Sequence, residues 1–96
     1  MKKVINEGGF RKAMRAGKTW TTLDCQLSET EENRWYFEID KHVFTGSPEE
    51  GVMGKGDASW EQLASGDGLD LCETIWNNLI EKYNPDEYFV DRHNLA

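Results

Sequence analysis

Apolar and polar residues alternate along two stretches in the first half of the chain, a pattern typical of β-strands with one buried face. The first stretch covers residues 19–27 and the second covers residues 34–39. The six residues between them are polar and acidic, which predicts a hairpin loop and antiparallel pairing. After a bend at residues 40–41, residues 42–45 predict a short third strand. The positions expected on the buried sides are Thr21, Leu23, Cys25, Leu27, Trp35, Phe37 and Ile39.

Helical spacing is strongest over residues 69–83, where apolar residues recur every three or four positions. This long helix is expected to end at Asn84 because the residue before a proline, here Pro85, disfavours the helical conformation. Residues 6–16 predict a short basic helix, and Gly17 is a natural stop because glycine adopts the left-handed conformation easily.

The remaining segments complete a small α+β domain over residues 1–96. Ser59 followed by Gln62 resembles a capping box and predicts a second short helix through residue 64. Residues 46–57 are rich in glycine and predict a surface loop, and the tail around residues 88–90 predicts an extra turn or an edge strand. The expected fold is a small antiparallel sheet of two or three strands, packed with an N-terminal short helix and a long C-terminal helix.

Charge is distributed unevenly along this chain. Residues 1–23 have a net charge of +5 and residues 24–96 a net charge of −12, which gives the overall −7. Such an acidic body is repelled by nucleic acid and by anionic membranes and attracted to basic protein surfaces. No apolar run approaches the roughly 20 residues of a membrane helix, and the N-terminus lacks the apolar core of a signal peptide. We therefore expect a cytoplasmic protein that binds neither membrane nor nucleic acid directly.

Several acidic clusters are candidates for contact with a basic partner, although such clusters also occur in solvated loops and helix starts. Trp35 and Trp76 fall on apolar faces and are expected in the core, whereas Trp20 and Trp60 are either covered or available as interface anchors. The residues predicted to bind a partner are Glu29, Glu31, Glu32, Glu49, Glu50 and Trp60.

The sequence does not indicate an enzyme, a cofactor or a metal site. Cys25, Cys72, His42 and His93 do not have the short spacings of zinc ligands. The glycines of residues 46–57 do not form a phosphate-binding motif, and acidic neighbours would repel phosphate. The two cysteines are interpreted as small buried hydrophobic residues, with a disulfide or a reactive thiol as the alternatives.

The segment from Phe10 to Lys18, followed by a strand that bears a tryptophan, resembles the start of various small phage-encoded proteins. The overall composition is similar to that of small acidic phage inhibitors of the anti-CRISPR and DNA-mimic type. That resemblance implies a short, non-enzymatic protein located in the cytoplasm of a host cell, and many proteins of this type occupy a basic groove on a nuclease. It carries over no functional residue.

Three functional hypotheses follow. The first is a non-enzymatic inhibitor or adaptor whose acidic face docks on a basic surface of a nucleic-acid-binding protein, for example a host-defence nuclease complex. The second is a structural or regulatory phage-type accessory protein that forms a homodimer through the helix Leu69–Tyr83 and the tail Tyr88–Val90. The third is a small enzyme or ligand-binding protein that uses the loop 46–57.

Overall fold

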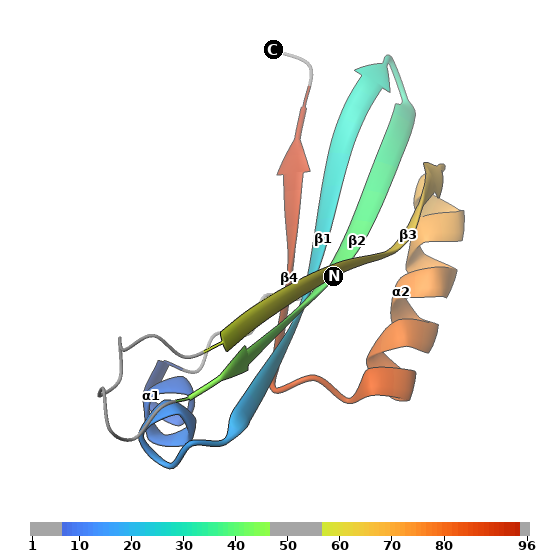
Figure 1. Ribbon diagram of the computed structural model, residues 1–96. Helices are drawn as coiled ribbons and strands as arrows, with labels where there is room; N and C mark the ends of the chain where they lie inside the picture. Colours follow the sequence, from blue (N-terminus) through green and yellow to red (C-terminus); the bar gives the residue numbers. More distant parts are fainter. Residues whose placement is uncertain (1–6, 47–56, 95–96) are drawn as a thin grey trace.

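A computed structural model of the chain describes residues 7–46 and 57–94. These residues form four strands and two helices, which follow one another as α1, β1, β2, β3, α2 and β4 (Figure 1). Their bounds are Glu7–Arg15 for α1, Thr19–Glu31 for β1, Arg34–Thr45 for β2, Asp57–Asp67 for β3, Leu69–Tyr83 for α2 and Glu87–His93 for β4.

The strands form one mixed sheet in the order β3-β2-β1-β4. β1 pairs antiparallel with β2, and β2 pairs antiparallel with β3, whereas β4 lies parallel to β1 at the opposite edge from β3. Because β3 and β4 run in the same direction at opposite edges, the connection between them must cross the sheet. α2 makes that crossing, as a helix does in most parallel connections.

The predicted hairpin and the predicted long helix are both confirmed, but residues 28–31 of the predicted six-residue loop belong to β1. β1 and β2 pair from Thr19 with Thr45 up to the turn, where Asn33 takes a positive φ of 63°. The expected third strand over residues 42–45 is the continuation of β2. α2 has the predicted bounds, and Asn84 ends it in the left-handed conformation while its N–H donates to the Ile80 carbonyl at 2.8 Å.

The predicted sheet, however, is wrong in size and type: it has four strands and is not purely antiparallel. The segment expected to be a short helix at residues 59–64 belongs to β3, whereas the tail forms the edge strand β4, one of its two predicted alternatives. A register shift in β3 explains the error at residues 59–64, because Ile39 pairs with Ala64 and Asp40 with Gln62, so that Leu63 is an extra residue. Such a bulge breaks the two-residue alternation by which a strand is recognised.

α2 packs on one face of the sheet and closes the core. The residues of this core are almost completely buried and come from β1, β2 and α2: Leu23, Cys25, Leu27, Phe37, Ile39, Cys72 and Trp76. Trp76 also contacts Tyr88 of β4 edge to face, with 6.1 Å between the ring centroids. The helix thus joins both edges of the sheet through one apolar layer.

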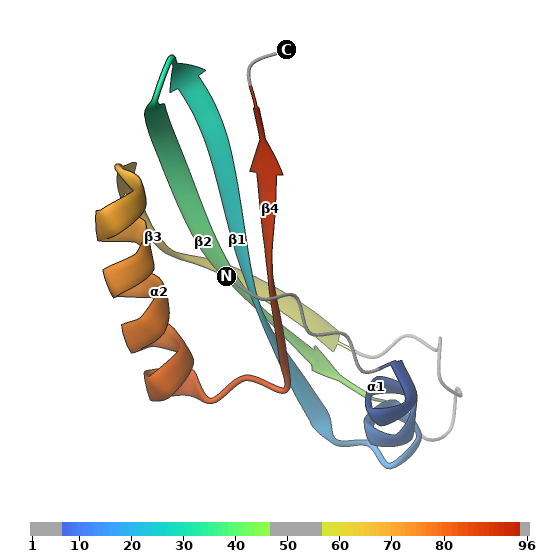
Figure 2. The same cartoon turned by 180° about the vertical axis from the view of Figure 1, so that it is seen from behind.

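α1 lies far from α2, near the end of the sheet where β1 begins (Figures 1 and 2). Its Phe10 ring contacts Trp20 and Phe44 edge to face, at centroid distances of 5.9 and 5.7 Å, and Met14 is buried. Trp20 and Phe44 belong to the face of the sheet opposite α2, because they alternate with Leu23 and Val43. The two helices therefore cover opposite faces, and α1 buries Trp20, so Trp20 is not an exposed anchor.

Replacing Gly46 by alanine is expected to displace α1 from the sheet. A β-carbon at Gly46 would collide with the backbone of Met14, and backbone atoms cannot move aside as a flexible side chain would. We expect the free energy of unfolding to fall by about 1–3 kcal/mol, measured by urea denaturation. The exposed substitution Ala58→Ser on β3 is the control, and an equally small effect of both variants would contradict the close contact.

Candidate functional site

The sheet face opposite α2 carries a regular array of polar side chains. Residues in register across neighbouring strands share a face, so the strand pairing assigns this array without ambiguity. From α1 toward the hairpin tip, its four rows read Trp60–His42–Thr22–Glu87, Gln62–Asp40–Asp24–Phe89, Ser65–Glu38–Gln26–Asp91 and Asp67–Tyr36–Ser28–His93. We call these sixteen side chains the acidic face, because six of them are carboxylates.

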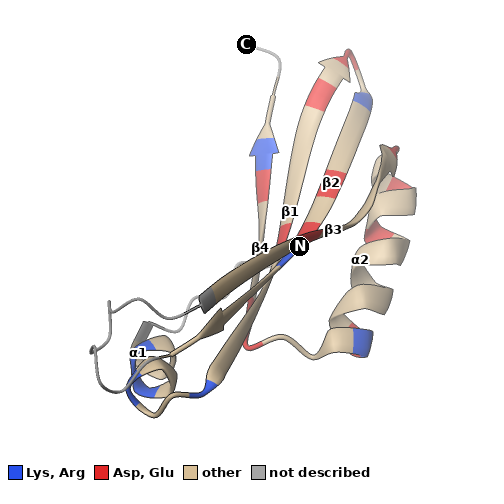
Figure 3. Cartoon of the chain, in the orientation of Figure 1, with Lys and Arg blue, Asp and Glu red and all other residues tan. Residues whose placement is uncertain are grey.

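The lysine and arginine side chains of the described strands lie outside this array, which contains the histidines His42 and His93. Lys41 and Arg92 alternate onto the α2 side, where each lies over an aromatic ring, Lys41 over Tyr83 at 4.8 Å and Arg92 over Trp35 at 5.6 Å. The third, Arg34, lies beyond the last row at the hairpin tip. Figure 3 shows acidic positions along β1, β2 and β4 and basic ones on α1. Strand alternation thus keeps lysine and arginine out of the array, while Glu29 and Glu61 share the α2 side with Lys41.

A hydrogen-bond network fixes the centre of the acidic face. The Gln26 amide donates to Asp24 at 2.8 Å and to Asp91 at 3.1 Å, and its oxygen lies 2.9 Å from the His93 ring nitrogen Nε2. One side chain therefore orients two carboxylates on neighbouring strands. Asp40 lies directly opposite Asp24 on β2, so like charges meet across this strand pair.

The pKa of Asp24 is raised above its usual range. Burial is the largest cause, and the charges of Asp91 and Asp40 act in the same direction, whereas the hydrogen bond from Gln26 and the charge of His42 lower this pKa. A cationic group docked here would relieve this repulsion, whereas an anion would increase it. The electrostatics of the acidic face therefore favour a basic ligand.

β4 is held against β1 by contacts at its start, which position its carboxylates. The Thr21 N–H donates to an Asp86 carboxylate oxygen at 2.7 Å, and the Asp86 N–H donates back to the Thr21 carbonyl at 2.9 Å. The Thr22 hydroxyl then donates to Glu87 at 3.2 Å. These contacts join residues 65 positions apart in the sequence.

Trp60 borders the acidic face on its β3 side and is 62% exposed. It lies in register with His42, whose ring stacks on Phe44 with a centroid distance of 6.2 Å. An exposed tryptophan beside a charged surface is the type of residue that anchors protein interfaces. Its prediction as a possible anchor therefore agrees with its exposure, although it lies on a strand rather than on a helix.

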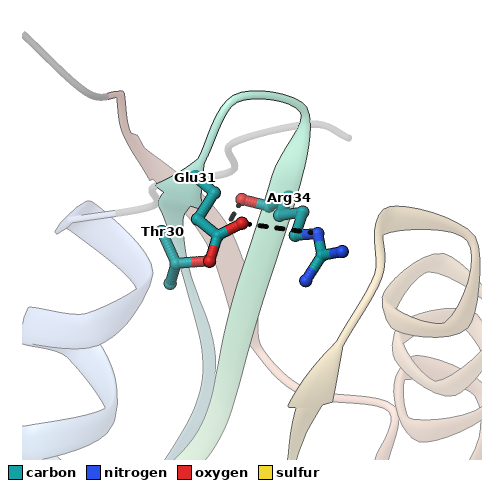
Figure 4. Close-up of polar contacts among 3 residues, drawn as sticks. All are labelled: Thr30, Glu31 and Arg34. Carbon is teal, nitrogen blue, oxygen red and sulfur yellow. Dashed lines mark hydrogen bonds and ion pairs between the residues drawn. The ribbon is translucent and has the colours of Figure 1, made fainter.

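The predicted glutamates occupy a different part of the molecule. Glu31 and Glu32 are exposed at the β1–β2 turn, where the Arg34 side chain lies 3.6 Å from Glu31 and the Thr30 hydroxyl donates to the Arg34 carbonyl (Figure 4). Glu29 is half-buried and in register with Trp35, on the α2 side. Glu49 and Glu50 lie outside the described residues.

The predicted set does not form one compact site. Along β2, the partner of Glu31 is Arg34 and the partner of Trp60 is His42, eight positions further on. Eight strand residues span about 26 Å, so the hairpin glutamates and Trp60 are separated by most of the sheet. Sequence reasoning missed the four central carboxylates, Asp24, Glu38, Asp40 and Asp91. The available signal was that the first two lie on the polar sides of predicted strands.

Two surface grooves lie away from the central carboxylates, and the larger of them shares Asp67 with the acidic face. The larger, about 810 Å³, lies between the hairpin tip and the start of α2 and includes Trp35, Asp67, Leu69 and Leu71. The smaller, about 560 Å³, lies on α1 and is lined by Gly8, Arg11, Lys12, Arg15 and Ala16. The chain thus has a basic surface at one end of the molecule.

Within residues 7–46 and 57–94, no group of three or more histidine, cysteine, aspartate or glutamate side chains is arranged to hold a metal ion. None of the helices in this part of the chain is long and apolar enough to cross a membrane.

The fold and the acidic face define a small α+β protein with a mixed four-stranded sheet and one helix on each face. No protein-family model, no curated protein and no solved structure matches the chain.

Proposed function

We propose that this chain is a non-enzymatic protein-binding inhibitor or adaptor whose acidic face docks on a basic surface of a nucleic-acid-binding protein. The observation that carries the proposal is the central cluster of Asp24, Asp40, Glu38 and Asp91, which no lysine or arginine of the described strands enters. The resemblance in composition to phage inhibitors of the anti-CRISPR and DNA-mimic type supports the same proposal.

Rigidity supports binding over simple solvation. The central carboxylates stand on three hydrogen-bonded strands, and Gln26 holds two of them in place. A basic partner consequently meets a prearranged set of charges and loses less conformational entropy than it would on flexible loops. Trp60 at the border adds an apolar contact that excludes water from the charged pairs.

The basic helix α1 makes the charge of this surface asymmetric. It packs over Trp20 and Phe44, so its exposed Arg11, Lys12 and Arg15 lie at one end of the acidic face. A partner surface that is basic throughout would be attracted to the carboxylates and repelled by α1. The complementary partner therefore has a basic patch with an acidic or neutral border, which fixes the orientation of docking.

The structure leaves less exposed apolar surface on α2 for a homodimer than the sequence predicts. The apolar stripe of α2, including Ile75, Leu79 and Tyr83, packs against the core of its own chain, and Leu71 is the one α2 residue among the exposed large hydrophobic side chains. A dimer through α2 stays a prediction. The loop of the third hypothesis lies outside the described residues, apart from Gly46 and Asp57.

The proposal is tested by affinity purification of host-cell proteins on the immobilised chain, after nuclease treatment, at low and at moderate salt. We expect a nucleic-acid-binding protein to be retained at low salt and lost as salt rises, because salt screens exposed charge pairs. Added duplex DNA should also displace it, because DNA competes for the same basic surface. Retention that is insensitive to both salt and DNA would contradict the electrostatic docking. Recovery of the chain alone would favour the homodimer.

A further inference from the structure

Two cysteines from distant parts of the sequence meet inside the core. Cys25 lies on β1 and Cys72 lies on α2, 47 positions later, and their Sγ atoms are 3.5 Å apart. Both thiols are free, and both residues are completely buried. Contact between the two sulfur atoms requires that α2 dock on β1, so the pair reports the formation of the central helix–sheet contact.

Burial keeps both thiols protonated in the folded chain. It is the main cause that raises the pKa of each thiol. The hydrogen bond between them raises the pKa of Cys25 further and acts in the opposite direction on Cys72. A thiolate is the species that attacks a disulfide, and neither sulfur is accessible in the closed fold.

We propose that Cys25 and Cys72 form a redox-modification site, which a low-molecular-weight disulfide such as glutathione disulfide converts into an intrachain disulfide when the helix–sheet contact opens or first forms. The thiolate of one cysteine attacks one sulfur of glutathione disulfide, whose S–S bond breaks, and one glutathione thiolate leaves. The thiolate of the other cysteine then attacks the sulfur of the first and displaces the second glutathione. The protein loses two electrons, glutathione disulfide is reduced to two glutathione molecules, and these take up the two thiol protons.

Three features favour the intrachain product. The sulfur atoms lie on elements that the core holds in contact, so the second attack is intramolecular. The pair belongs to the same buried cluster as Leu23, Leu27 and Trp76, and with both cysteines completely buried the closed fold leaves no exposed space for a glutathione group. Closing a 47-position loop also restricts the unfolded chain, which stabilises the folded state. This inference does not depend on the identity of any partner.

The test starts from the full chain, reduced and unfolded in denaturant, which is refolded in mixtures of reduced and oxidised glutathione. We expect a product that has lost two hydrogen atoms, carries no glutathione, resists alkylation and melts roughly 10 °C or more above the reduced chain. Single variants Cys25→Ala and Cys72→Ala should form only the glutathione adduct. If either variant fails to fold, the alkylation rates of native and denatured wild-type chain provide the second measurement, with strong protection expected in the native chain.

Three results would overturn the proposal. The first is stable glutathione adducts on the wild-type chain in place of the intrachain bond. The second is a disulfide between two chains. The third is an oxidised monomer that melts below the reduced one, because it would mean that the bond distorts the contact between β1 and α2.

Discussion

Replacing Asp24, Asp40 and Asp91 together by asparagine is expected to weaken binding to the basic partner by about 100-fold. These carboxylates occupy the two central rows of the acidic face, and all three are half-buried. Each charge pair that such a group forms with a lysine or arginine contributes roughly 1 kcal/mol, so three pairs together correspond to about two powers of ten in the dissociation constant. Titration calorimetry with the purified partner measures the change.

The same substitution is expected to raise thermal stability at neutral pH. The folded state raises the pKa of Asp24 through burial and through Asp91 and Asp40, so the folded chain holds this proton more tightly than the unfolded chain. The stabilising contribution of the protonated group is therefore fully present below the ordinary pKa of 3.8 and is lost as pH rises through the higher folded value. Asparagine stays neutral and can keep the contact with Gln26, so its advantage should disappear at low pH.

A matched control distinguishes the effect of the acidic face on binding from the effect of the total charge of the chain. The variant with Glu29, Glu31 and Glu32 changed to glutamine removes the same charge at the hairpin. We expect only a few-fold loss of affinity, because Glu31 and Glu32 are exposed at the hairpin tip and Glu29 lies on the α2 side, so all three are distant from the central carboxylates and are screened. An equal loss in both variants would mean that net charge alone drives binding. A loss of stability in the asparagine variant would mean that the cluster has a structural role.

Replacing Trp76 by alanine is expected to lower the free energy of unfolding by about 3–5 kcal/mol. Trp76 is 2% exposed and is the largest side chain of the core, and its ring contacts Tyr88 of β4. A chain of this size has roughly 5–15 kcal/mol of total stability, so the variant would lose a large part of it. We also expect β4 to exchange its amide hydrogens faster, because the tryptophan connects α2 to that edge strand.

The control for this substitution lies on the same helix. Leu71 is 50% exposed, so Leu71→Ala should change stability by less than about 0.5 kcal/mol. Thermal unfolding followed by circular dichroism would compare the two variants, and the expected melting temperature of Trp76→Ala is at least about 12 °C below wild type. Similar effects of the two substitutions would indicate that α2 does not pack as described.

The local sequence pattern predicts a helix or strand correctly where that pattern is uninterrupted within the element itself. The β1–β2 hairpin follows from alternation on both sides of a short polar turn, and α2 follows from helical spacing that ends before Pro85. β3 was misread because the extra residue Leu63 interrupts its alternation and because Ser59 and Gln62 imitate the start of a helix. Pairing with β2 outweighs that local preference, as tertiary contacts commonly do.

The candidate site could be predicted only in part for a related reason. The sequence predicts the excess of carboxylates but leaves Trp60 either covered or exposed, and the structure shows that it is exposed. The glutamates predicted at Glu31 and Glu32 lie at the hairpin tip. Runs of acidic residues attract attention in a sequence, whereas the central carboxylates are separated by as many as 67 positions, from Asp24 to Asp91. Only strand register brings them together.

The sequence by itself determined the charge of the chain, the hairpin, the long helix and the two cysteines. The tertiary structure decided that β3 and β4 complete a mixed sheet, that Cys25 and Cys72 touch, and that Asp24, Glu38, Asp40 and Asp91 share a face. The physical reason is that the period of a helix or strand depends on neighbouring residues, whereas register and strand order depend on contacts that form only when the whole core assembles.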